Sequence, residues 1–167
     1  TEIEDELTRA VIWTALWNLT RDGELAAVDY VGGVVKHEAY ETNTTLLATA
    51  CANANFAIAH YIADAELEQA RTDYAEAIWG HLAEAEPASD AQLVLARAAI
   101  RALVATPEES GTERLRALLN GEVAGLRMDP EIRWSILRAL AARDAITLAE
   151  LEKEKRRDNT LTGATEF

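Results

Sequence analysis

The chain has 167 residues and a formal net charge of −13, and 49% of it is hydrophobic although only 6% is aromatic. This acidity disfavours nucleic acids and anionic membranes as partners, because both attract proteins through basic faces. The apolar residues are mostly Ala and Leu, and only three Pro and eight Gly interrupt them, so the composition predicts an all-α fold.

Helical periodicity recurs from end to end, without a convincing strand pattern. The connections are short, so successive helices are expected to be antiparallel neighbours. Helix pairs recur about every 40 residues, which is typical of HEAT-like and armadillo-like repeats. We therefore predict that residues 1–167 form a single domain, a stacked superhelical array of about eight helices whose concave side is the default contact surface. The predicted helices span about 4–21, 26–38, 44–62, 65–86, 90–105, 112–120, 130–143 and 147 onward, and Thr42-Asn43 is predicted to cap the third of them.

The first predicted helix is apolar on most sides, which is typical of a helix in the centre of a fold. Gly23 follows it and favours the left-handed conformation that ends helices. Gly32 and Gly33 weaken the second helix, and we expect them to allow the close approach of a neighbour. Trp13 and Trp17 share one face of the first helix and are expected to anchor the core between stacked helices rather than to form a ligand platform. The other two tryptophans are Trp79 and Trp134.

Capping residues mark the starts of the later helices. Asp64 and Ser89 are predicted to cap the fourth and fifth helices, and Asp129 before Pro130 is predicted to open the seventh. Thr147 with Glu150 forms a capping-box pattern at the start of the last helix. That helix alternates acidic and basic residues, which predicts a solvated face rather than a binding patch.

The segment His37-Glu38-Ala39-Tyr40-Glu41 is the nearest approach to a metal motif. Zinc peptidases use His-Glu-x-x-His on a helix, where two imidazoles four residues apart bind the metal and the Glu activates water. Here Glu41 replaces the second His, and the segment falls at a predicted helix end. We therefore interpret it as a solvated terminus, with His37 near the negative end of the helix dipole.

The remaining candidates for chemistry are isolated. His60 and His81 fall on neighbouring predicted helices and could approach each other, but Asp64 favours a local contact with His60. Arg133 is expected to pair with an acidic neighbour inside the protein, and a ligand carboxylate is the alternative. Cys51 is the only cysteine, which excludes an internal disulfide, and its small apolar neighbours predict a buried thiol.

Other reaction classes are disfavoured as well. Gly32-Gly33 lacks the preceding strand and the Lys of a phosphate-binding loop. No serine lies in a nucleophile elbow; the three are Ser89, Ser110 and Ser135. We therefore assign no catalytic, cofactor-binding or metal-binding residue within this chain.

Several segments match, in order and spacing, the caps and core anchors of a known domain. They are 10–17, 20–25, 29–31, 41–43, 86–87, 89–90, 92–93, 129–134 and 158–163. In this arrangement, which runs over nearly the whole chain, the sequence resembles the C-terminal helical domain of actinobacterial aminopeptidase N-type zinc peptidases. That domain is similar to the C-terminal domain of endoplasmic-reticulum aminopeptidase 1.

The resemblance implies a non-catalytic domain that lies over the zinc site of a thermolysin-like catalytic domain in the same longer chain. Such a domain encloses a chamber, limits peptide access and can touch the far end of the peptide. The parent's His-Glu-x-x-His and Gly-x-Met-x-Asn motifs are absent here, so none of the family's catalytic residues is carried over. Zinc is accordingly expected in the parent enzyme, and the implied partners are its catalytic domain and its peptide substrate.

Other readings stay open on the sequence alone. A free-standing helical scaffold could bind a protein partner along its concave face, and a small metal- or ligand-binding enzyme could be built around His60 and His81. The chain begins with Thr1 and resembles part of a larger enzyme, so we expect a fragment of a longer protein. The sequence shows no signal peptide and no apolar run of transmembrane length, which predicts a cytoplasmic location.

Overall fold

The computed structural model describes residues 3–106 and 109–158, and within these ranges the chain is helical and contains no strand. The predicted all-α class is confirmed. The helices are α1 Glu6–Arg21, α2 Ala27–His37, the 3-10 helix η1 Glu38–Tyr40, α3 Thr44–His60, α4 Asp64–Glu84, α5 Asp90–Ala105, α6 Glu109–Asn120, α7 Pro130–Ala142 and α8 Leu148–Arg157.

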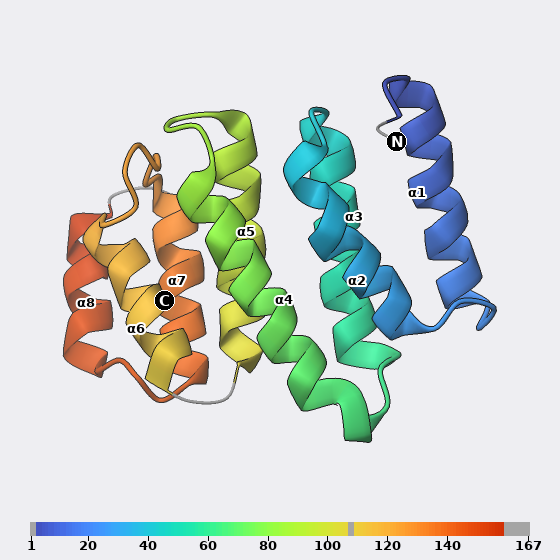
Figure 1. Ribbon diagram of the computed structural model, residues 1–167. Coiled ribbons are helices and arrows are strands. Elements are labelled where there is room, and N and C mark those ends of the chain that lie inside the picture. The colour runs from blue at the N-terminus through green and yellow to red at the C-terminus, as the bar shows by residue number, and fades with distance from the viewer. Residues whose placement is uncertain (1–2, 107–108, 159–167) are drawn as a thin grey trace.

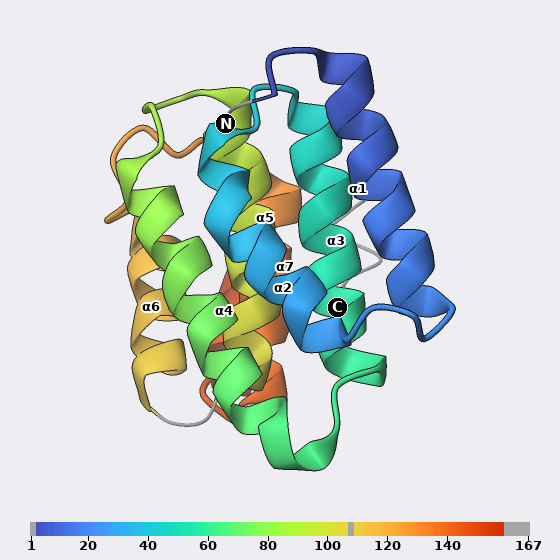
Figure 2. The same ribbon diagram turned by 45° about the vertical axis from the view of Figure 1, so that its right-hand side comes forward.

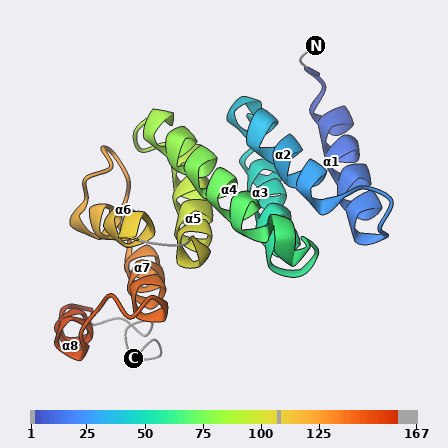
Figure 3. The same cartoon turned by 60° about the horizontal axis from the view of Figure 1, so that its bottom comes forward.

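The helices stack as successive pairs in two layers. α2 packs on α3, α4 on α5, and α6 on α7. One layer holds α3, α5 and α7, with α5 between its two neighbours, and the other holds α2, α4 and α6 (Figure 3). α1 and α8 lie at opposite ends of the stack (Figure 1). This arrangement confirms the predicted HEAT-like array of helix pairs.

Side-chain caps define several helix starts as predicted. Asn43, Ser89 and Asp129 each accept hydrogen bonds from backbone N–H groups in the first turn of their helix. Thr147 forms the complete capping box with Glu150. The prediction for Asp64 was wrong: it lies inside the first turn of α4, where its charge faces the positive end of the dipole, and Ala63 occupies the cap position without a side-chain bond.

The glycine predicted to end α1 does so, but the glycines that allow close packing are not those predicted. Gly23 ends α1 with φ of +78°, as predicted. A Cβ atom added to Gly32 or Gly33 would meet nothing within 4 Å, so the close approach predicted there was wrong. Two other glycines are tight: an added Cβ on Gly125 would meet Pro87, and one on Gly111 would lie 2.9 Å from the Leu103 carbonyl oxygen, against which the first turn of α6 rests. α6 can therefore begin this close to the end of α5 because Gly111 has no side chain.

The core runs through the stack and is centred on α5, which contacts α3, α4, α6 and α7. Trp134 of α7 is buried. Trp13 and Trp17 of α1 are partly buried and contact the Tyr30 ring at centroid distances of 6.2 and 5.5 Å, as anchors between helices. Trp79 is partly buried against the same core.

The central position predicted for the first helix was wrong. α1 lies at the edge, against α2 and α3 on one side only (Figure 2). Leu7 is 72% exposed and Val11 is 60% exposed, and Thr20 is the buried residue of this helix. Apolar residues around most of a helix therefore do not specify its place here, because the outer face of the last helix in a stack has no neighbour. No described helix is both long and apolar enough to cross a bilayer.

Candidate functional site

The His37–Glu41 segment is folded into the protein rather than solvated. α2 ends at His37, which is exposed as expected, and the chain continues directly as the 3-10 helix η1. Glu38 is only 2% exposed, and its Oε1 lies 2.6 Å from Nδ1 of His81 on α4. Glu41 is also buried, and its carboxylate accepts a hydrogen bond from Nη2 of Arg9 at 3.0 Å. The expected solvated terminus is wrong for both glutamates, because each is covered by a helix distant in sequence.

Burial controls the chemistry of the Glu38 cluster, which we define as Glu38, His81, Cys51 and Tyr74. Desolvation raises the pKa of the Glu38 carboxyl, although hydrogen bonds from His81 and Cys51 act in the opposite direction. Cys51 Sγ donates to Glu38 Oε2 at 3.5 Å, and burial raises the pKa of this thiol far above its ordinary value. Tyr74 donates its hydroxyl to the Cys51 carbonyl at 3.2 Å. The buried thiol predicted for Cys51 is confirmed.

Metal ligation by these side chains is not supported by their placement. Among residues 3–106 and 109–158, no three His, Cys, Asp or Glu side chains gather in a group that could hold a metal ion. The Glu38 cluster supplies one imidazole and one carboxylate, and its thiol is kept protonated by burial. It ties α2 and η1 to α3 and α4.

The two histidines proposed to share a site are far apart. His60 ends α3 and is exposed against the Phe56 ring, 4.3 Å away between centroids. α4 has 21 residues, and it begins beside the end of α3 that carries His60, whereas His81 lies near its other end. Roughly 25 Å of helix axis therefore separates His81 from the start of α4. The predicted approach was wrong. The expected helical contact of Asp64 with His60 was also wrong, because the chain turns between α3 and α4.

Arg133 has the internal acidic partner that the sequence predicted. Its Nε and Nη2 atoms donate to the two carboxylate oxygens of Glu154 at 2.7 and 2.8 Å, which joins α7 to α8. The hydrogen bonds from Arg133 lower the pKa of Glu154. Glu154 is buried, so the predicted solvated face of α8 is wrong at this position, although the charged residues around it are exposed.

The neighbouring Trp134 contacts the residue that follows α8. Its indole Nε1 donates to Asp158 Oδ2 at 2.7 Å. Two of the segments that carry the resemblance, 129–134 and 158–163, therefore meet in the fold at Asp158. Residues 159–163 of the second segment lie outside the described residues.

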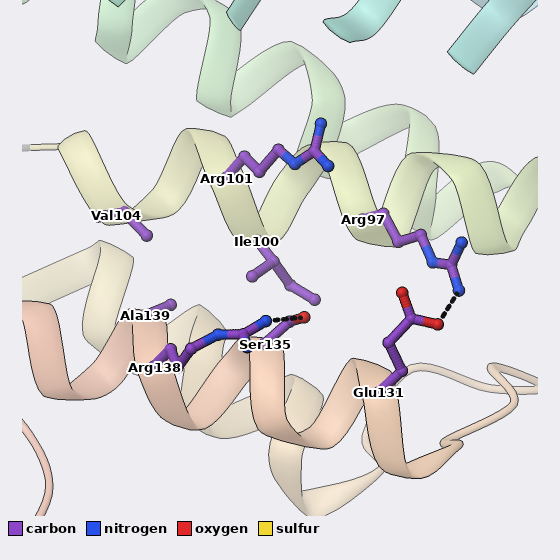
Figure 4. Close-up of a pocket in the computed structure, with 8 residues that line it drawn as sticks. All are labelled: Arg97, Ile100, Arg101, Val104, Glu131, Ser135, Arg138 and Ala139. Carbon is purple, nitrogen blue, oxygen red and sulfur yellow. Dashed lines mark hydrogen bonds and ion pairs between the residues drawn. The ribbon is translucent and has the colours of Figure 1, made fainter. Parts of the chain in front are cut away.

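A groove with a volume of about 350 Å³ lies between α5 and α7 (Figure 4). Arg97 lies across it from Glu131, with Nη2 and Oε2 3.0 Å apart, and Arg138 donates to Ser135 Oγ at 3.1 Å. The full lining is Arg97, Ile100, Arg101, Val104, Glu131, Ser135, Arg138 and Ala139. We call this the α5–α7 groove.

A smaller recess of about 210 Å³ lies on the other side of α5, against α3 and the first half of α4. Arg101 borders both recesses, and Arg71 of α4 lines the second. Sequence reasoning missed this arginine group. The spacing of Arg97 and Arg101 was a signal, since residues four apart share a helix face, but the partners on α4 and α7 become visible only in the fold.

Comparison with known proteins gives the family. The model of the ERAP1-like C-terminal domain matches residues 1–166. Aminopeptidase N of Streptomyces lividans is 35% identical over 164 residues, which are 97% of this chain and 19% of the relative. The chain thus spans about a fifth of the length of that protein. The resemblance inferred from caps and core anchors is confirmed, and the chain belongs to the family of ERAP1-like C-terminal domains.

Proposed function

We propose that this chain is the non-catalytic C-terminal domain of a cytoplasmic zinc aminopeptidase and encloses part of the chamber in which the peptide lies. The observation that carries the proposal is the alignment of 97% of the chain with an aminopeptidase N at 35% identity. The fold supports it, because stacked helix pairs form an extended surface suited to contact with a neighbouring domain or a long ligand.

The reacting groups belong to the rest of the parent in this proposal. Zinc held there would activate the water that attacks the first peptide bond. The residues of this chain act by excluding bulk solvent and limiting which peptides reach the catalytic domain. The buried candidates for chemistry serve packing instead, since the pKa of the Cys51 thiol is raised by burial and Glu38 is paired with His81.

Zinc content and peptidase activity of the purified 167-residue chain test whether the reacting groups lie outside it. We expect no cleavage of an aminoacyl amide and no zinc retained in stoichiometric amount after dialysis. The parent enzyme, assayed in parallel, should show both. Cleavage together with tightly held zinc in the 167-residue chain would overturn the proposal.

The exposed apolar face of α1 favours an interface at this end of the stack, which also fits the alternative of a free-standing scaffold for a protein partner. The complete reading frame separates the two functions. A His-Glu-x-x-His motif encoded several hundred residues before Thr1 supports the aminopeptidase domain. A start codon immediately before Thr1 supports the scaffold.

A further inference from the structure

The acidity of the chain is unevenly divided between its two layers. α2, α4 and α6 contain nine acidic residues and four Lys or Arg residues. α3, α5 and α7 contain two acidic residues and four arginines, and α3 has no acidic residue. Arg133 is paired with Glu154 of α8, and the three other arginines still outnumber the two acidic residues, so the α3–α5–α7 layer is the more basic layer of a chain whose net charge is −13. A carboxylate approaching this layer is attracted locally although the whole molecule is acidic.

Glu131 shows how a carboxylate binds in the α5–α7 groove. It engages Arg97 at 3.0 Å while the two side chains remain 68% and 44% exposed. An ion pair this exposed contributes little stability and exchanges readily with other partners. A ligand carboxylate can therefore share Arg97 with Glu131 or replace it.

Arg101 and Arg71 extend the basic surface beyond this groove. Arg101 is exposed between the two recesses, and no carboxylate among the described residues pairs with it. The Nε atom of Arg71 is buried and no acceptor in the described part of the chain reaches it. Both guanidinium groups keep hydrogen-bond donors that fit the oxygen atoms of a carboxylate.

The walls of the α5–α7 groove between the arginines are apolar. Ile100 and Ala139 are buried there, and Val104 is partly exposed. A small inorganic anion would gain nothing from these walls, whereas a peptide carries acidic and apolar side chains at the same time. The mixture of arginines and aliphatic side chains therefore favours a peptide segment as the occupant.

We propose that the surface over α5, between α3 and α7, binds a peptide segment with acidic side chains, whose carboxylates contact Arg97 and Arg101 and whose apolar side chains pack on Val104. This binding is a property of the chain itself and does not depend on the proposed role in an aminopeptidase. Its failure would leave that role untouched.

Fluorescence anisotropy with a labelled peptide of alternating glutamate and leucine tests the proposal. The peptide ends are blocked with acetyl and amide groups, so that only side-chain carboxylates can bind. Matched probes replace glutamate with glutamine, or carry a free terminal carboxylate on the glutamine peptide. We expect saturable binding of the glutamate peptide that weakens with added salt, and at least tenfold weaker binding of both neutral-side-chain probes.

Arginine variants locate the site. Arg101→Gln should weaken binding about fivefold, and the Arg97→Gln/Arg101→Gln double variant about 20-fold. The control is Arg127→Gln, which removes the same charge from an exposed residue between α6 and α7, outside both recesses. It should change binding less than twofold. Thermal unfolding verifies that each variant is folded.

Removing the competing carboxylate should have the opposite effect. Glu131→Gln frees Arg97 and should tighten binding about threefold, whereas Glu152→Gln on the exposed side of α8 should change it less than twofold. Equal effects of the groove and control variants would overturn the proposal. So would equal affinity for a neutral-side-chain probe, or no saturable binding of the glutamate peptide by the unmodified chain.

Discussion

Glu38 and Glu154 are both buried glutamates that join helices in opposite halves of the stack, but their protonation equilibria are shifted in opposite directions. Glu38 faces His81 and the weakly polar Cys51, so desolvation prevails and raises its pKa. Glu154 faces Arg133, whose two hydrogen bonds lower the pKa despite burial. The partner of a buried carboxylate therefore decides whether its charge is tolerated.

The two junctions should accordingly respond to pH in opposite ways. The pKa of Glu154 is lowered, so its stabilising contribution is present above the unfolded-state pKa and is lost as pH falls through the folded-state pKa. The pKa of Glu38 is raised, so its contribution is complete below the unfolded-state pKa and declines as pH rises through the folded-state pKa. The two glutamates provide a matched pair for mutagenesis.

The largest expected effect follows from removing Arg133. Arg133→Met removes both short hydrogen bonds to the buried Glu154 and leaves the exposed Arg157 near it, at 3.8 Å, so the free energy of unfolding at pH 7 should fall by about 2–4 kcal/mol. Urea denaturation measures the loss. The double variant Arg133→Met/Glu154→Leu should recover most of it, since no unpaired charge remains. A loss below about 0.5 kcal/mol in the single variant would show that the pair is solvated and exchangeable.

The Glu38 junction should respond less and with a distinct pH dependence. Glu38→Gln keeps the shape and weakens the bond to His81, so we expect a loss of about 1 kcal/mol at mildly acidic pH. Because the variant cannot ionise, its deficit relative to the unmodified chain should shrink as pH rises through the folded-state pKa of Glu38. Urea denaturation at a series of pH values from about 4.5 to about 8 measures the difference in free energy of unfolding between the two proteins. A deficit that grows with pH would contradict the raised pKa.

Cys51 reports whether the Glu38 junction opens independently of the C-terminal half. Its thiol is buried and its pKa is raised, so alkylation of the folded chain should be at least about 100-fold slower than in denaturant. Glu38→Ala should accelerate alkylation about tenfold or more. Arg133→Met, compared under conditions in which both variants remain folded, should accelerate it less. Equal acceleration would mean that the stack opens as one cooperative unit.

The smallest effect is expected for the exposed pair of Arg97 and Glu131. Replacing Glu131 by Gln should change the free energy of unfolding by less than about 0.5 kcal/mol, because both side chains are largely solvated. Differential scanning calorimetry should show nearly the same unfolding temperature. A larger loss would mean that this pair, like that of Arg133, is part of the structural framework.

Local features of this fold were predictable from the sequence because their causes lie within a few residues. The cap at Asp129 and the capping box at Thr147 are examples, since each side chain bonds to the next turn. The acidic partner of Arg133 was predicted as a residue type. Its identity was not, because Glu154 lies 21 positions away.

Features that depend on the stacking of helices were not predictable from one sequence. Glu38 is buried by His81, 43 positions away, and nothing within the His37–Glu41 segment indicates that contact. The edge position of α1 depends on which helix lacks a second neighbour. The basic α3–α5–α7 layer likewise appears only after the helices are assigned to layers, although each charge was visible in the sequence.

The most direct test of the proposed function is the length dependence of cleavage by the parent aminopeptidase with and without this domain. Rates would be measured for an aminoacyl amide and for a series of longer peptides, with zinc content as the control for an intact catalytic domain. We predict that deletion preserves zinc and amide cleavage but abolishes the discrimination among peptide lengths. An unchanged length dependence in a zinc-loaded, active deletion variant would contradict a role in enclosing the chamber.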